Sequence, residues 1–118
     1  MMKQNSFNLS DKSLDKQKAP FVYTDEQLIA RFQAGDENAY IELVNRFRDR
    51  LINFVFQFLG DREQSEDVVQ DTMLKLYVKK HYYREIAKFS TWIYTIARNL
   101  ANTELRKRKR RKTTLLSQ

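Results

Sequence analysis

The 118-residue sequence contains no cysteine, one proline, two glycines and one histidine. The absence of cysteine excludes disulfides, thiolate metal ligands and cysteine nucleophiles, and it is typical of a reducing compartment. The scarcity of glycine and proline disfavours a sheet with many turns and favours helices joined by short links. His81, the single histidine, has no second ligand at metal spacing, and no glycine-rich phosphate loop is present. We therefore expect no metal, no cofactor and no enzymatic activity.

Long apolar segments are also missing. The first residues, MMKQNSFNLSDK, lack the apolar core of a signal peptide. No window approaches the roughly eighteen apolar residues of a membrane span, so we expect a cytoplasmic protein without membrane insertion. The 22 basic and 15 acidic residues give a net charge of +7. This balance favours a polyanionic partner, with nucleic acid first and an anionic membrane surface second.

The spacing of apolar residues predicts an all-α fold, a compact bundle of about four helices in a single domain. We expect a flexible N-terminal arm over residues 1–22 and a helical domain over residues 23–112. Residues 113–118 are predicted to be a disordered tail or the start of a linker. The chain is long enough to bury one core, and its eight Phe, six Tyr and one Trp supply the apolar volume.

Capping residues set the expected helix boundaries. Thr24 and Gln27 form a capping box for a first helix that ends at Gly35. Asp36 begins a second helix that runs to about Leu59. A third helix begins at Asp61 or Ser65 and runs to about Lys80, and a loop follows over residues 81–89. Ser90 is the expected cap of the fourth helix, which continues into a basic run. Apolar stripes on the second and third helices include Phe58 and Tyr77.

The third predicted helix carries an acidic face. Asp67, Gln70, Asp71 and Leu74 recur at steps of three and four residues and so share one side. Complementation of the helix dipole explains acids in the first turn, such as Glu63 and Glu66, but explains Asp71 poorly. A solvated face is one interpretation of this pattern. The other is a docking surface for a basic helix, in which charge complementarity sets register and association rate.

Basic and aromatic residues interleave in the loop and its flanks. Cations that follow phosphates and rings that stack on unpaired bases are what single-stranded nucleic acid requires. The alternative is that the aromatic residues fill the end of the bundle. We expect that for Phe89 and Trp92, whereas Tyr82 and Tyr83 are expected to be exposed.

The fourth predicted helix presents Arg98, Asn99 and Asn102 on its polar side, and it ends in seven consecutive cations from Arg106 to Lys112. Asparagine reads base edges, although an ordinary solvated face is the alternative. The cationic run indicates phosphate contact rather than specificity. The residues assigned to nucleic-acid binding are Lys79, Lys80, Tyr82, Tyr83, Lys88, Arg98, Asn99, Asn102, Arg106, Arg108 and Lys109.

Three stretches resemble the extracytoplasmic-function group of bacterial sigma factors, over their second conserved region. They are LIARFQAGDENAYIELVNRF, SEDVVQDTMLKLY and FSTWIYTIARNLANTELRKRKRRK, and the resemblance covers about residues 24–112. The D-V-V-Q-[DE] run and the F-x-T-W-[IL]-Y-x-I-A-x-N run are each fairly specific. Their order and spacing make chance similarity improbable.

The resemblance implies a function. Asp67, Gln70 and Asp71, with Leu74 nearby, would dock on the clamp helices of the β′ subunit of core RNA polymerase. The loop and last helix would bind the non-template strand of the promoter minus-ten element and hold the duplex open. Tyr83 would contact a flipped-out base, and Asn99 would lie at the same pocket. The family also implies an anti-sigma factor as a partner.

Two departures from the family pattern stand out. The loop has REIAK where relatives often carry small residues, which affects the expected loop conformation and base preference. The linker and the C-terminal domain for the minus-thirty-five element are not in this sequence, so by itself it is expected to bind polymerase but to initiate poorly. Two alternatives are a basic helical regulator that does not depend on polymerase and a protein-binding adaptor with no nucleic-acid role.

Overall fold

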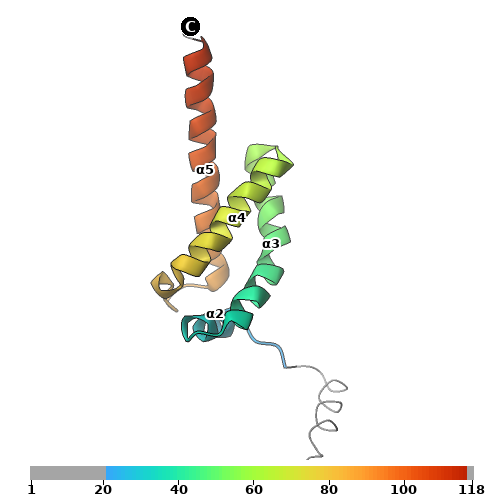
Figure 1. The fold of residues 1–118 in the computed structure, drawn as a ribbon, viewed down its shortest axis with the longest axis vertical. Helices are drawn as coiled ribbons and strands as arrows, with labels where there is room; N and C mark the ends of the chain where they lie inside the picture. The colour runs from blue at the N-terminus through green and yellow to red at the C-terminus, as the bar shows by residue number, and fades with distance from the viewer. Residues whose placement is uncertain (1–20, 117–118) are drawn as a thin grey trace, which may run out of the picture.

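The computed structural model of the chain describes residues 21–116, and these residues form an all-α bundle without strands (Figure 1). This confirms the predicted fold class. Most of the predicted N-terminal arm, residues 1–20, lies outside the described residues, as do residues 117–118. The elements in chain order are α2 (Asp25–Gln33), α3 (Glu37–Leu59), α4 (Arg62–Val78), the short 3-10 helix η1 (Lys80–Tyr82) and α5 (Phe89–Leu116).

Local capping explains where three of the four helices begin. Thr24 and Gln27 make the expected capping box at the start of α2. The Asp36 carboxylate accepts a hydrogen bond from Asn38 N at 3.0 Å at the start of α3. Asp61 caps α4, because its carboxylate accepts from Gln64 N at 2.9 Å. Gly60, between α3 and α4, has φ of +64°, a conformation that glycine adopts without steric cost.

The two ends of α5 differ from the predictions. The helix begins at Phe89, one residue before Ser90, and no hydrogen bond from the Ser90 side chain caps it within the described residues. The Phe89 N–H instead donates to the Glu26 carboxylate of α2, at 2.8 Å. At the other end the helix continues to Leu116, so residues 113–116, predicted to be a disordered tail or the start of a linker, are helical in the structure. Arginine and lysine propagate helices well, which favours helix through the basic run of residues 106–112, and residues 113–116 add its last turn.

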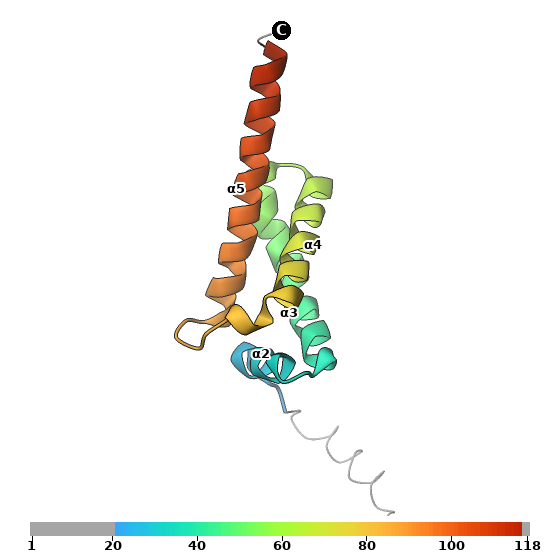
Figure 2. The ribbon, with the colours of Figure 1, turned by 60° about the vertical axis from the view of Figure 1, so that its left-hand side comes forward.

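The hydrophobic core lies where α3, α4 and α5 pack together and where α2 crosses the end of the bundle (Figure 2). Each large apolar side chain that is fully buried stabilises the fold by about 1.5–3 kcal/mol. Two residues of the predicted stripes are not in this core. Phe58 is 36% exposed and Tyr77 is 42% exposed, and the Tyr77 hydroxyl donates to Glu37 across the surface. The largest fully buried side chains are Phe32, Phe47, Phe89, Ile29, Leu43, Leu51, Ile52, Leu76 and Ile93.

The second half of α5 extends beyond the other helices as a single rod (Figures 1 and 2). In the part of the chain that the structure describes, no helix is both long and apolar enough to cross a membrane. The same residues contain no group of His, Cys, Asp or Glu side chains that could hold a metal ion.

Candidate functional site

The outer face of α4 carries the predicted acidic surface. Asp67, Gln70 and Asp71 are exposed, and Leu74 is 60% exposed beside them. Between residues 21 and 116, no ion pair involves Asp67 or Asp71, so the basic end of α5 does not neutralise them. Glu66 differs, because Arg62 pairs with it at 3.4 Å. The structure therefore brings the four predicted residues together on one face and leaves its two carboxylates available to a partner.

Burial of the opposite side of α4 fixes this orientation. Val69 and Leu76 lie in the core. Two hydroxyl residues are buried there as well, and each bonds to the carbonyl four residues earlier: Ser65 to Asp61 O at 2.7 Å and Thr72 to Val68 O at 2.8 Å. Because these polar groups are satisfied within the helix, the inner face packs without a penalty for unpaired donors. If α4 rotated about its axis so that the acidic face pointed inward, Val69 and Leu76 would be exposed to solvent.

Tyr83 contradicts the prediction of exposure. Its side chain is 5% exposed, and its ring packs edge to face on Phe89 and Trp92, with centroid distances of 5.7 and 5.4 Å. The Tyr83 hydroxyl donates to Ala87 O and so closes the loop. Adjacent residues can point in opposite directions here because Tyr83 leaves η1 in an extended conformation, with φ of −69° and ψ of 135°. Phe89 is fully buried and Trp92 half-buried, as predicted for residues that fill the end of the bundle.

Tyr82 and the loop tip face solvent. Tyr82 is 69% exposed, and the Lys79 ammonium lies 4.7 Å from its ring centroid. Ile86 at the tip is 95% exposed, and Lys88 is also exposed. Lys80 points the other way, because its ammonium lies 4.3 Å from the centroid of the Phe32 ring. Of the predicted loop residues, the structure therefore places Lys79, Tyr82 and Lys88 on the surface.

The polar side of α5 presents most of the predicted basic and amide residues. Arg98, Asn99, Arg106 and Lys109 are exposed, and Asn102 is half-buried. These side chains recur at helical spacing and form a stripe along α5.

Arg108 departs from this arrangement. Its guanidinium donates to Leu59 O at 2.9 Å and to Gln64 Oε1 at 3.1 Å. It therefore anchors α5 to the turn between α3 and α4 and is less available to a phosphate than its neighbours.

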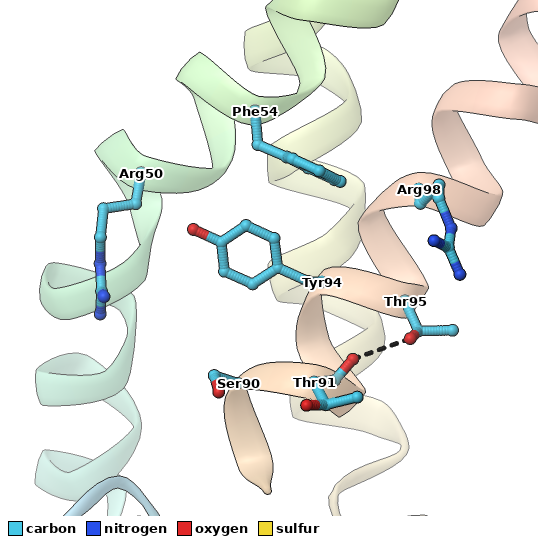
Figure 3. Close-up of a pocket in the computed structure, with 7 residues that line it drawn as sticks. All are labelled: Arg50, Phe54, Ser90, Thr91, Tyr94, Thr95 and Arg98. Atoms are coloured by element: carbon cyan, nitrogen blue, oxygen red, sulfur yellow. Dashed lines mark hydrogen bonds between the residues drawn. The ribbon is translucent and has the colours of Figure 1, made fainter.

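An open cavity of about 560 Å³, which the sequence patterns did not predict, lies between α3 and the start of α5 (Figure 3). Figure 3 shows two guanidinium groups, those of Arg50 and Arg98, with the Tyr94 ring between them in the view. The helical spacing of Thr91, Thr95 and Arg98 was a signal in the sequence, whereas nothing local placed Arg50 nearby. Seven residues line the cavity: Arg50, Phe54, Ser90, Thr91, Tyr94, Thr95 and Arg98.

The cavity combines cations, hydroxyls and a fixed aromatic ring. Tyr94 packs edge to face on Phe54 at a centroid distance of 4.9 Å. Arg50 Nε donates to Arg46 O at 3.0 Å, which orients the Arg50 side chain. Among the described residues, no acidic side chain pairs with Arg50 or Arg98. Such a surface suits an anion that is attached to a planar ring, as in a nucleotide of a single strand.

Comparison with known proteins points to one family. The family model described as Sigma-70 region 2 matches residues 43–111. The chain is 32% identical over 81 residues to the ECF RNA polymerase sigma factor SigW of Bacillus subtilis, an alignment that covers 69% of this chain and 43% of that protein. It is 34% identical over 87 residues to the RNA polymerase sigma-H factor of Pseudomonas aeruginosa, covering 74% and 45%. The chain thus spans less than half the length of these relatives.

A solved structure is similar in fold and sequence. It is the NMR structure of an engineered region 2 of sigmaE in complex with GTAAAA. The TM-score is 0.68, the sequence identity is 35%, and the similarity covers 75% of this chain and 93% of that one.

Proposed function

Since the chain belongs to the sigma-70 region 2 family, whose model matches residues 43–111, we propose that it binds core RNA polymerase and captures the unpaired non-template strand of a promoter minus-ten element. The relatives that it matches place it with the extracytoplasmic-function group, as the sequence motifs predicted. The activity and the partners of the whole protein are part of this proposal.

One observation carries the proposal. The matched segment contains two separate polar surfaces with opposite charge, and neither neutralises the other. The first is the acidic face of α4, where the carboxylates of Asp67 and Asp71 form no ion pair with any other described residue. The second comprises the loop after α4, the cavity that Arg50 and Arg98 line, and the basic stripe of α5.

The acidic face is the proposed polymerase site. Asp67, Gln70, Asp71 and Leu74 offer two carboxylates, an amide and an apolar side chain within about two helical turns. A basic helix of the partner could pair with the carboxylates and pack on Leu74, and opposite charges would accelerate its approach. The clamp helices of the β′ subunit are the partner that the family resemblance implies.

The loop and α5 are the proposed strand site. The ring of Tyr82 is free to stack on a base, with Lys79 close enough to meet the adjoining phosphate. Asn99 on the exposed side of α5 is the proposed reader of a base edge. Because Tyr83 is buried, we propose that it supports the loop from beneath and does not itself contact a base. Extrusion of a base costs a few kcal/mol, which these contacts and the backbone charge would offset without catalysis.

Reversing the charge of Arg98 tests the strand site. We expect Arg98→Glu to weaken binding to a labelled single strand about tenfold or more, because one phosphate contact becomes a repulsion. The slope of log affinity against log salt should fall by about one. Fluorescence anisotropy over a series of salt concentrations measures both quantities.

Arg48→Glu is the matched control. Arg48 is an exposed arginine of α3 outside this cavity, and among the described residues its one ion pair is with the neighbouring Asp49, at 3.2 Å. If Arg48→Glu weakens strand binding as much as Arg98→Glu does, the cavity is not a specific strand site and only net charge matters.

Selection from a randomised single strand tests recognition itself. We expect the full chain to enrich particular bases at one or more positions, and Asn99→Ala to reduce that enrichment. Recovery of strands without any base preference would contradict promoter recognition.

The alternative of a regulator that does not depend on polymerase is not favoured by the comparisons. The proposed role would place the chain in the cytoplasm, and an anti-sigma partner stays a prediction to which no residue is assigned.

A further inference from the structure

We propose that α2 is a clamp that fixes the conformation of the loop after η1, with Gln33 and Glu26 as its two positioning residues. The inference rests on the proposed function, because it assigns to α2 the control of base selectivity at the strand site. The helix lies outside residues 43–111, the segment that matches the family model. It crosses beneath η1 and the start of α5 (Figure 2).

Gln33 holds the first end of the loop. Its side-chain amide, Nε2, donates to Lys80 O at 2.7 Å and to Tyr83 O at 3.3 Å. These carbonyls belong to η1 and to the residue where the chain turns extended. One side chain thereby fixes the exit of η1, from which Tyr82 is presented to solvent.

Glu26 holds the other end. Its Oε2 accepts the Phe89 N–H at 2.8 Å, at the first residue of α5. The first backbone N–H groups of a helix have no partner within that helix, and a carboxylate there is also favoured by the helix dipole. α2 therefore supplies the cap that Ser90 does not supply.

The loop has little else to define it. Between Tyr83 and Phe89 the internal hydrogen bonds are those from the Tyr83 hydroxyl to Ala87 O and from Ala87 N to Arg84 O. Its tip, including Ile86, is exposed. Residues 84–88 are exposed and have few contacts, so they open easily. The shape of the loop therefore depends on the contacts that hold Tyr83 and Phe89 at its two ends.

α2 is itself firmly placed, as a clamp must be. Leu28, Ile29 and Phe32 are buried in the core. Arg46 of α3 donates to the Asp25 carboxylate at 3.0 Å and ties the start of α2 to the bundle.

Gln33→Glu in the full chain is the sharpest test. The new carboxylate cannot donate to the two carbonyls and repels them. Glu26→Ala removes the other contact, whereas Glu26→Gln retains an oxygen that can accept the Phe89 N–H. Gln57→Glu, at an exposed position on α3, is the charge-matched control, because any added negative charge weakens binding to nucleic acid.

Two readouts are needed. In hydrogen exchange, Gln33→Glu and Glu26→Ala should speed exchange of the amides of residues 80–89 about tenfold, while core amides of α3 keep their rates. In strand binding, the quantity to compare is the affinity for the strand that the wild type selects, divided by the affinity for its scrambled form. Both variants should lower this ratio. Glu26→Gln should restore most of that ratio, and Gln57→Glu should weaken both strands equally.

The clamp is refuted if residues 80–89 exchange at the wild-type rate in both variants. If the loop loosens while the affinity ratio is unchanged, the control of base selectivity by α2 is refuted. The exchange experiment needs no nucleic acid. A wild-type chain that does not discriminate between strands would therefore refute the base-selectivity part of the clamp together with the proposed function. Faster exchange in the variants would still show that α2 holds the loop.

Discussion

Tyr83→Ala is expected to lower the free energy of unfolding by about 3–5 kcal/mol, the usual cost of removing a buried aromatic side chain. The ring is 5% exposed and packs on Phe89 and Trp92, so its removal leaves a cavity at the end of the bundle. It also removes the hydroxyl that closes the loop onto Ala87 O. Chemical denaturation of the full chain measures the loss.

The pH dependence of stability should reflect the same residue. Burial, with smaller effects from Glu26 and Glu85, raises the pKa of the Tyr83 hydroxyl above its ordinary value of 10.0. The contribution of the neutral hydroxyl to stability is therefore complete below pH 10 and is lost as the pH rises through the raised pKa. In Tyr83→Phe this loss at high pH should be smaller.

Tyr82→Ala is the control from the adjacent position. Its side chain is 69% exposed, so the stability should change by no more than about 0.5 kcal/mol. Binding to a single strand should nevertheless weaken, by the stacking energy of about 1–3 kcal/mol. If Tyr83→Ala leaves stability unchanged, the buried position of Tyr83 is contradicted.

The second large effect is expected from Asp71→Arg, which should weaken binding to core RNA polymerase at least tenfold. Asp71 is exposed and unpaired among the described residues, so the substitution removes an attraction and places a repulsive charge against a basic partner. Like charges that face each other across an interface cost several kcal/mol. Co-precipitation and a titration with labelled chain measure the affinity.

Asp49→Arg is the matched control for this variant. Asp49 lies on α3, its side chain is 85% exposed, and within residues 21–116 its one ion pair is with the neighbouring Arg48. It should fold as the wild type does and bind polymerase equally well. Equal losses in the two variants would show that net charge, rather than the face of α4, governs binding.

Helix positions could be predicted from the sequence because their determinants are local. The capping box of Thr24 and Gln27, the Asp36 cap and the turn at Gly60 are each defined within a few residues, and the observed α3 begins and ends where they predict. The acidic face also followed from spacing alone, since residues three and four apart share one side of a helix.

The errors arose where distant segments meet. The start of α5 depends on Glu26, 63 positions away in the sequence. The burial of Tyr83 depends on the turn that follows η1 and on the rings of α5. The cavity needs Arg50 from α3 beside Arg98 from α5, and Arg108 is drawn from the basic run to the turn at Leu59. No periodicity in a single segment encodes such contacts.

The most direct test of whether the two surfaces bind two different partners is hydrogen exchange of the full chain, measured once in complex with each partner. With core RNA polymerase, protection should appear on α4 around residues 67–78. With a minus-ten single strand it should appear at residues 79–89 and on α5 between Arg98 and Lys109, and both ligands should be able to bind the chain at the same time. Protection of the same residues by both ligands, or competition between them, would contradict the account.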